Sequence, residues 1–417
     1  MKLFAAGALA LTMLVAPAWA EEPDGLKLPP GFHATVVADG LIGMRHLAVR
    51  ENGDIYISTR PARGLSNQGV IALRLDKSGA VVRTERFGTV SGGTGIRIHG
   101  KSLYTNSVTG VYRFDFAGDD LIPVAAPQPV IDGMPTGGQT NRVLAFDNKG
   151  ALYLSVSGTG NICNDPNGPK DAKPIGLTPC PSLSNRSGIW RFSPNNLGQK
   201  FPADGVQVAT GIRDLLAFDY RRGDALYGVM HGRNGTAATW PDLVSAVDDD
   251  AVAEEMHRIV PGTDFGWPTT YYDGVRKVRL LAPEYGGDGK TSPAAGAFST
   301  PVATFTGHSS PLDLVFYNGR QFPREYRGGA FIAFHGGVGD GGAAGRPGYN
   351  VGFVPFVNGK PGEWTVFADG FAGPDPADRN AAKATYRPVG LAVAPDGSLY
   401  VADSQKGRLW RITYAGK

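Results

Sequence analysis

Cysteine is scarce in this sequence, with two among 417 residues, Cys163 and Cys180. No Cys-x-x-Cys-His stretch occurs, so the chain carries no c-type haem site of its own, and a metal site on these two thiols would need further ligands. Both cysteines lie in a polar loop, "NICNDPNGPKDAKPIGLTPC" (161–180). In an oxidising compartment such a pair forms a disulfide, which would contribute roughly 3 kcal/mol by closing a short loop.

The sequence also lacks an excess of charge of one sign. The formal net charge is +3, and no run of Lys and Arg forms a stripe. Nucleic acid and an anionic membrane surface are therefore not expected partners. After the first residues no apolar stretch is long enough to span a bilayer, so no membrane span is expected.

The first 20 residues, "MKLFAAGALALTMLVAPAWA", combine a basic residue, an apolar stretch and the small-x-small site Ala18-Trp19-Ala20. This pattern is typical of a bacterial secretory signal that is removed after export. We therefore expect residues 1–20 to be a signal peptide and residues 21–417 to form a periplasmic protein.

Segments with the length and 3.6-residue period of a strong amphipathic helix are missing as well. Instead, the chain repeats a sequence pattern of short apolar runs separated by Gly, Asn or Asp turns, as in "RPVGLAVAPDGSLYVADSQKGRLWRITY" (387–414). Tyr56, Tyr104, Tyr153, Tyr227 and Tyr400 occupy one equivalent place in five copies. The copies begin in the following ranges: 45–58, 94–106, 141–156, 213–229, 311–334 and 387–414.

Irregularly spaced copies, each with three or four antiparallel strands, predict an all-β fold, a six-bladed β-propeller formed by residues 21–417 as one domain. A β-sandwich is the alternative, but it would not explain why one sequence pattern is repeated six times. The segment "FHATVVADG" (32–40) would supply an outer strand to the last blade and close the ring. The insertions are expected to gather on one face and build a site there; they are 156–187, 230–253, 262–310 and 335–347.

The first strand of each blade lines the axis of a propeller, so the residues just before it meet at the mouth of the central channel. Like charges gathered on an axis repel, so a polyanionic ligand is expected to neutralise them. Arginine suits carboxylates and stacks on flat rings, which favours a flat, polycarboxylated molecule. The expected mouth residues are Arg45 with His46, Thr94, Asn141 with Arg142, Arg213 with Asp214, His308 with Ser309, and Arg387.

At these residues the sequence resembles the soluble pyrroloquinoline quinone (PQQ) dependent glucose/sorbosone dehydrogenases, which are six-bladed propellers that oxidise sugars or their aldehydes. Matching stretches cover most of the chain in order. The most specific is "AEEMHRIVPGTDFGWPTTYYD" followed by "LAPEYGGDG"; the others include "GTGNICND", "ATGIRDLLAFD", "MHGRN" and "YRPVGLAVAPDGSLYVAD".

The resemblance implies PQQ lying flat near the axis, a Ca²⁺ ion that polarises its ortho-quinone, and a sugar above it whose hydroxyl proton is taken by a base. By position, Arg45, Arg213 and Arg387 match arginines that hold the cofactor, and Arg142 and Arg346 are two further candidates. The loop His231-Gly232-Arg233 resembles the family's calcium-binding loop, so backbone carbonyls of Gly232 and Arg233 are the expected metal ligands.

The sequence departs from the family at three places. "GGQTNR" (137–142) lacks the family's catalytic His, Asp214 stands where the family has Asn, and "HGGVGDGGAAGR" (335–346) replaces a shorter stretch with Trp and Asn. Another group must then supply the base, and the candidates are His308, Asp214 and His231. Of the adjacent Glu254 and Glu255, only one can face a given site, because neighbouring strand residues point to opposite faces.

Three functions follow from this pattern. The favoured one is a periplasmic PQQ-dependent sugar dehydrogenase that passes electrons to an external acceptor such as a cytochrome c or a quinone. A propeller that binds PQQ or sugar without turnover is the second, because the family's His is missing. A Ca²⁺-dependent hydrolase of the lactonase kind is the third, and basic rather than acidic residues at the axis count against it.

Overall fold

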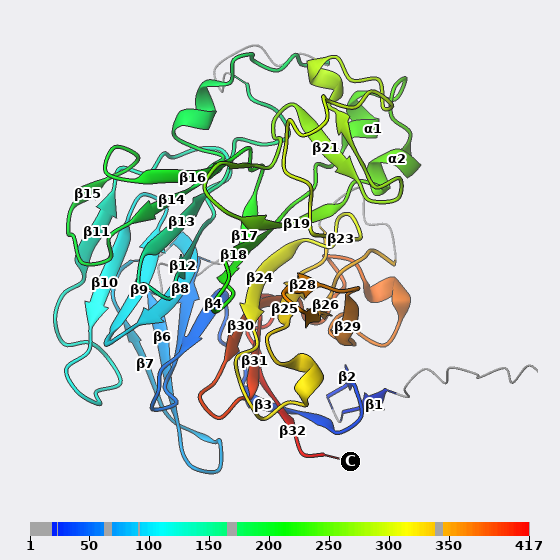
Figure 1. Cartoon of the computed structure of the whole chain (residues 1–417). Coiled ribbons are helices and arrows are strands. Elements are labelled where there is room, and N and C mark those ends of the chain that lie inside the picture. The colour runs from blue at the N-terminus through cyan, green and yellow to red at the C-terminus, as the bar shows by residue number, and fades with distance from the viewer. Residues whose placement is uncertain are drawn as a thin grey trace, which may run out of the picture.

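The computed structural model describes residues 19–22, 24–61, 69–90, 92–164, 173–337 and 345–416. Residues 1–18 of the predicted signal peptide and residues 338–344 of the last insertion lie outside this part. Within it, sheets of four antiparallel strands, two of them extended by a fifth strand that pairs in parallel, follow one another along the chain and form a six-bladed β-propeller (Figure 1), as the repeats predict.

The innermost strand of each blade lies at the axis and contacts the inner strand of the next blade. The last inner strand contacts the first, which closes the ring. These strands are β4 (Met44–Val49), β8 (Gly92–His99), β12 (Arg142–Phe146), β17 (Leu215–Tyr220), β24 (Pro311–Phe316) and β30 (Pro388–Val393). Both faces of an inner strand are covered, and most side chains of β12, β17, β24 and β30 are accordingly apolar, whereas β8 is rich in glycine and β4 also contains Arg45 and His46.

The second and third strands complete the middle of each blade by antiparallel pairing. The second strands are β5 (Ile55–Thr59), β9 (Ser102–Ser107), β13 (Leu152–Val156), β18 (Leu226–Met230), β25 (Ala330–Phe334) and β31 (Leu399–Asp403). The third strands are β6 (Val70–Leu75), β10 (Val111–Asp115), β14 (Gly188–Phe192), β19 (Glu254–Ile259), β26 (Asn350–Val354) and β32 (Leu409–Tyr414). Gly53, Gly150 and Gly397 in the turns between first and second strands have positive φ, which glycine adopts without strain.

The outer strands are more exposed and more polar than the inner ones. They are β7 (Val81–Phe87), β11 (Gln128–Asp132), β16 (Val206–Thr210), β23 (Ala303–Phe305), β29 (Thr365–Ala368) and β3 (Phe32–Ala38). Two short strands extend blades two and three, β15 (Gln199–Lys200) and β20 (Thr263–Asp264). Strand β3 pairs with β32, so the prediction that the N-terminal segment completes the last blade is confirmed.

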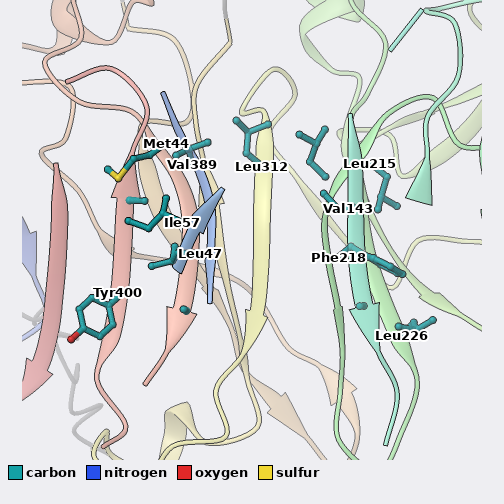
Figure 2. Packing of buried hydrophobic residues seen from close by; sticks show 14 of the residues in the cluster. Met44, Leu47, Ile57, Val143, Leu215, Phe218, Leu226, Leu312, Val389 and Tyr400 are labelled. Atoms are coloured by element: carbon teal, nitrogen blue, oxygen red, sulfur yellow. The ribbon is translucent and has the colours of Figure 1, made fainter. Parts of the chain in front are cut away.

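One large hydrophobic cluster joins apolar side chains of the inner strands to side chains of the strands beside them (Figure 2), and further clusters lie between neighbouring blades. Met44, Val143, Leu215 and Val389 come from four different blades and are each fully buried. Each Å² of apolar surface that these side chains remove from water stabilises the folded state by about 25 cal/mol. Because the buried surface is shared between blades, it holds the blades in place relative to one another. The inner strand ends are thereby held in place.

The insertions form small elements beyond the blades, seen around the upper end of β17 and β19 in Figure 1. They include α1 (Thr236–Thr239), α2 (Ala246–Asp250), the hairpin of β21 (Thr270–Asp273) and β22 (Val278–Leu281), and the 3₁₀ turns Pro181–Ser184 and Pro283–Tyr285. The remaining short elements are β1 (Ala20–Glu21) with β2 (Lys27–Leu28), β27 (Phe356–Val357) with β28 (Lys360–Pro361), and the 3₁₀ turns Arg324–Tyr326 and Pro376–Asp378. Cys163 and Cys180 form the predicted disulfide. Of the helices described, none has the length and apolar character needed to cross a membrane.

Candidate functional site

A cavity of about 450 Å³ lies at one mouth of the central channel, where the inner strands begin. Five of the six blades contribute to its lining. Three of the four predicted insertions, 230–253, 262–310 and 335–347, add residues to it, which confirms the prediction for these three; no described residue of the insertion 156–187 lines the cavity. The residues predicted at this mouth that do line the cavity are Arg45, Asn141, Arg213, Asp214, His308 and Arg387.

Four arginines face this cavity: Arg45, Arg60, Arg213 and Arg387. Arg60 was not predicted, because it follows the second strand of its blade rather than preceding the first. His231 and His335 stand at the equivalent place after β18 and β25, so a rule that also included second-strand ends would have found Arg60 and His335. None of the four arginines forms an ion pair with a carboxylate of the described residues, so their charges are not cancelled by direct partners.

Arg213 and Arg387 are each held along one edge of the guanidinium by neutral oxygen atoms. Arg213 donates from Nε to Asn161 Oδ1 at 2.9 Å and from Nη2 to Asn234 Oδ1 at 3.1 Å. Arg387 donates from Nε to the carbonyl of His335 at 3.2 Å and from Nη2 to the carbonyl of Gly336. Both side chains keep their Nη1 groups for a ligand, and such an edge suits a carboxylate.

Arg45 and Arg60 are less fully bonded than the other two. The Nε atoms of both are buried and have no hydrogen-bond partner, and Arg60 donates from Nη2 to Asn141 Oδ1. Burial lowers the pKa of both groups, and the charge of Arg60 lowers the pKa of Arg45 further. Buried donors without acceptors are rare in folded proteins, so these atoms indicate a place where a polar ligand or water binds.

Two carboxylates, Asp214 and Glu254, also line the cavity, but neutral donors hold their oxygen atoms. Ser157 donates to Asp214 Oδ1 at 2.7 Å and Asn141 Nδ2 donates to Oδ2 at 3.3 Å. Glu254 accepts from the backbone N–H of Gly232 at 2.8 Å and of Ser310 at 3.0 Å. Counted over the described lining residues, four guanidinium groups face two carboxylates, which leaves an excess of positive charge in the cavity.

Glu254 and its neighbour Glu255 point to opposite sides, as strand geometry predicts. Glu255 is buried away from the cavity and bonds with His257 at 3.1 Å and with Arg279. The desolvation of Glu255 is outweighed by its bonds with Arg279 and His257, so its pKa is lowered. Glu255 is a packing residue, whereas Glu254 joins the Gly232 loop to Ser310.

Three histidines line the cavity. His231 donates from Nε2 to the carbonyl of Pro311 at 2.9 Å, and His308 from Nε2 to the carbonyl of Asp249 at 3.2 Å. Because a carbonyl only accepts, Nε2 carries the proton in both rings, and in the neutral ring Nδ1 offers a lone pair. His308 has a φ of 61°, a left-handed conformation that is rare outside glycine and that is found more often at functional sites.

The third histidine, His335, was not predicted. Its Nε2 lies 2.8 Å from Ser404 Oγ. Burial, followed by the charge of Arg387, holds the pKa of His335 well below its usual range, so its ring is neutral at neutral pH.

Six residues predicted for the mouth or the site have side chains that do not line the cavity: His46, Thr94, Arg142, Arg233, Ser309 and Arg346. His46 and Thr94 are fully buried, and Ser309 donates from Oγ to the carbonyl of Thr306 at 2.7 Å. Arg142 is fully buried and donates to three backbone carbonyls, those of Pro135, Gln139 and Asn141, at 2.8–2.9 Å. It stands next to Asn141, and alternation along a strand sends these neighbours in different directions. The side chains of Arg233 and Arg346 form ion pairs, at 2.7 Å with Glu284 and at 3.3 Å with Asp250 respectively.

The backbone of the His231–Gly232–Arg233 loop remains open to a metal. Of the described residues none donates a hydrogen bond to the carbonyl oxygen of Gly232 or of Arg233. The described part of the chain has no cluster of three or more His, Cys, Asp or Glu side chains that could hold a metal ion. A cation at this loop would therefore rely on backbone carbonyls and on oxygen atoms of a second ligand, which are groups that Ca²⁺ accepts.

The fold is similar to those of several solved structures. The holo form of the PQQ domain of pyranose dehydrogenase from Coprinopsis cinerea shares 18% identity at a TM-score of 0.73, with 94% of this chain and 98% of that one covered. A Trichoderma reesei carbohydrate-active enzyme of family AA12 shares 18% identity at a TM-score of 0.72, covering 98% and 100%. The PQQ-bound aldose sugar dehydrogenase from Streptomyces coelicolor shares 17% at 0.57, covering 93% and 99%.

A family model described as TrAA12-like matches residues 26–263 and 284–415. The two matched ranges contain all six blades and every residue that lines the cavity. No match was found among curated proteins.

Proposed function

The chain belongs to the TrAA12-like family, and we propose that it is a quinoprotein that oxidises a sugar or sugar aldehyde with PQQ as its cofactor. The observation that carries this proposal is the set of four guanidinium groups, Arg45, Arg60, Arg213 and Arg387, that face one cavity and have no carboxylate partner among the residues that the structure describes. PQQ is flat and carries three carboxylates, so it supplies the negative charge that this cavity lacks. The volume of about 450 Å³ is that of a small-molecule site.

The residues present fit this cofactor. Arg213 and Arg387 offer their Nη1 edges to carboxylates, and Arg45 and Arg60 offer buried Nε donors. Ca²⁺ would bind at the backbone carbonyls of Gly232 and Arg233. When bound, PQQ supplies the oxidising power, because its ortho-quinone accepts two electrons as a hydride.

The chain itself must supply the base that takes the hydroxyl proton of the substrate. His231 and His308 suit this role because their Nε2 atoms are committed to carbonyls and their Nδ1 atoms can accept a proton. Asp214 suits it less well, since Ser157 and Asn141 already donate to both of its oxygen atoms. The substrate would be an aldose or a sorbosone-type sugar, and electrons would pass to an external cytochrome c or quinone.

We place the protein in the periplasm, after removal of residues 1–20. This location rests on the signal pattern and is consistent with the disulfide between Cys163 and Cys180, which forms in oxidising compartments.

Reconstitution tests the proposal. Purified protein is titrated with PQQ in the presence of Ca²⁺, the quinone absorbance is followed, and dye reduction is then assayed with a panel of aldoses. A saturable spectral shift and sugar-dependent dye reduction are expected. If saturating PQQ produces no shift, the proposal is wrong.

The same titration decides between the proposed enzyme and a binding protein. The second function is favoured by one observation, namely that the stretch "GGQTNR" (137–142) lacks the catalytic His that the family has there. A spectral shift without turnover for any aldose would select the binding function. Lactone hydrolysis without PQQ would select a hydrolase, which the excess of guanidinium groups at the mouth does not favour.

A further inference from the structure

Two asparagines from separate insertions hold Arg213 in the cavity. Asn161, from the insertion at 156–187, accepts from Arg213 Nε, and Asn234, from the insertion at 230–253, accepts from Nη2. Asn161 Nδ2 in turn donates to the backbone carbonyl of Asn234 at 2.7 Å. The three residues form a closed network in which each is bonded to the other two.

The insertion residues are themselves anchored. Trp267 donates from Nε1 to the carbonyl of Gly160 at 2.9 Å, immediately before Asn161. Two residues after Asn161, Cys163 is joined by the disulfide to Cys180, and its N–H donates to the hydroxyl of Tyr285 at 3.1 Å. The backbone on both sides of Asn161 is therefore anchored by contacts that need no ligand.

The chemistry of this network differs from that of the arginines that are held by carboxylates elsewhere in the described part of the chain. Arg233 and Arg279, for example, are held by the carboxylates Glu284 and Glu255. A carboxylate fixes a guanidinium equally well but cancels its charge. Two amides fix the orientation and leave the positive charge and the Nη1 edge for a ligand.

We infer that Asn161 and Asn234 are positioning residues that aim an uncancelled Arg213 at a carboxylate of the cofactor, an inference that rests on the proposed function. Preorganisation of this kind raises affinity because the side chain loses less rotamer freedom when the ligand binds. Neither residue precedes an inner strand, so the axial pattern of the sequence does not reveal them.

The test compares the affinity for PQQ of the wild-type protein with that of Asn161→Ala and Asn161→Asp, each with Ca²⁺ present, by titration of the quinone absorbance at several salt concentrations. Asn148→Ala is the matched control. Asn148 lies in the turn between β12 and β13 and accepts one exposed hydrogen bond, from the hydroxyl of Tyr220 of the next blade. We expect Asn161→Ala to weaken binding about tenfold, the loss typical of one hydrogen bond to a charged group. Its melting temperature should stay close to that of the control.

The aspartate variant separates positioning from charge. Asn161→Asp keeps an acceptor for Arg213 Nε but adds a carboxylate, so it should bind PQQ at least as weakly as Asn161→Ala and with a smaller salt dependence. Wild-type affinity in Asn161→Ala would overturn the positioning role. Wild-type affinity in Asn161→Asp would overturn the requirement for a neutral partner.

A separate measurement keeps the inference testable if the proposed function is wrong. Should the wild-type protein not bind PQQ at all, the Nε–Hε resonance of Arg213 can be followed by ¹⁵N NMR and assigned by its absence in Arg213→Lys. Slow exchange of this proton in the wild type and fast exchange in Asn161→Ala would support the positioning role. Equal exchange in both proteins would overturn it.

Discussion

Among the described residues, amides and carbonyls rather than carboxylates hold Arg60, Arg213 and Arg387 at the mouth of the channel, and this choice of partner decides what the cavity accepts. Arg387, for example, is fixed by the carbonyls of His335 and Gly336 and is also 5.6 Å from the ring of Tyr349. Lysine cannot replace a planar guanidinium group held in this way, because its ammonium group is compact and lies at the end of a flexible side chain.

We therefore expect Arg387→Lys and Arg213→Lys each to weaken PQQ binding by about one to two orders of magnitude, since a hydrogen bond to a charged group is worth about 1.5–3 kcal/mol. Spectral titration measures the affinity. Arg258→Lys is the control, because Arg258 pairs with Asp224 on the surface at 2.8 Å. Unchanged affinity in both site variants would contradict the assignment of these arginines to the cofactor.

A second prediction at this scale concerns the base. His231→Ala or His308→Ala should lower kcat by about 10²–10⁴-fold, the usual contribution of a positioned base, while the affinity for PQQ stays within a few fold. Steady-state kinetics with dye as acceptor measures the effect, and His33→Ala, at a side chain 55% exposed, is the control. If neither variant loses activity, Asp214 becomes the candidate to test next.

A third prediction concerns Asp313, a buried residue of β24 that lies between the two mouths of the channel. Burial raises its pKa to about 7, although Arg97, at 3.4 Å, opposes the shift. The native state thus binds more protons than the unfolded state between about pH 4 and pH 7, so the free energy of unfolding falls as pH rises through this window.

Titration of Asp313 is expected to lower the free energy of unfolding by up to about 1.4 kcal/mol per pH unit in this window. Asp313→Asn removes this titration. In urea unfolding of the apoprotein, the free energy of unfolding of the variant should therefore rise relative to that of the wild type from pH 4 to pH 7, and the difference should stay constant above pH 8. A difference that is constant across this range would contradict the shifted pKa.

At the scale of single elements, the ends of strands rather than their lengths determine the site. The repeats predicted the inner strands and placed Arg45, Arg213 and Arg387 at one mouth. They did not reveal that residues after the second strands, Arg60 and His335, reach the same cavity, because a hairpin returns the chain to the end from which it started.

The disulfide loop supplies a prediction about an element. Replacing both cysteines with serine should lower the free energy of unfolding by roughly 3 kcal/mol if the loop opens with the whole molecule. Because Asn161 lies two residues from Cys163, the same variant should also bind PQQ several-fold more weakly. Urea unfolding and spectral titration measure the two effects, and loss of stability without loss of affinity would show that the anchors at Gly160 and Cys163 N–H suffice.

At the scale of the whole molecule, the ring is closed by pairing of β3 with β32 and by aromatic packing behind it. Phe32 of β3 is 1% exposed and contacts the rings of Phe322, Tyr326, Phe367 and Tyr414 at 4.8–5.2 Å between centroids. These rings belong to blades five and six, so Phe32 joins the last blade to its neighbour.

Phe32→Ala should therefore lower the free energy of unfolding by about 3–5 kcal/mol, the usual range for a buried phenylalanine. Val36→Ala on the same strand, 37% exposed, is the control and should change it much less. Thermal or urea denaturation measures both. An equal, small effect for the two variants would show that the ring does not depend on this cluster.

The sequence by itself determined the number of blades, the strand that closes the ring, the disulfide and the mouth of the channel that carries the arginines. These features depend on local patterns, such as apolar runs, turn residues and the position of a charge relative to a strand. Such patterns involve only residues that are close together in the sequence, so they can be recognised without the structure. Only the tertiary structure decided which of these side chains share a cavity. It buried Arg142 against backbone carbonyls, turned Arg346 towards Asp250, and brought Arg60 and His335 into the lining. The physical reason is that the partners of a site residue lie far away in the chain, as Asn161 does from Arg213, 52 residues on, and packing between blades selects them.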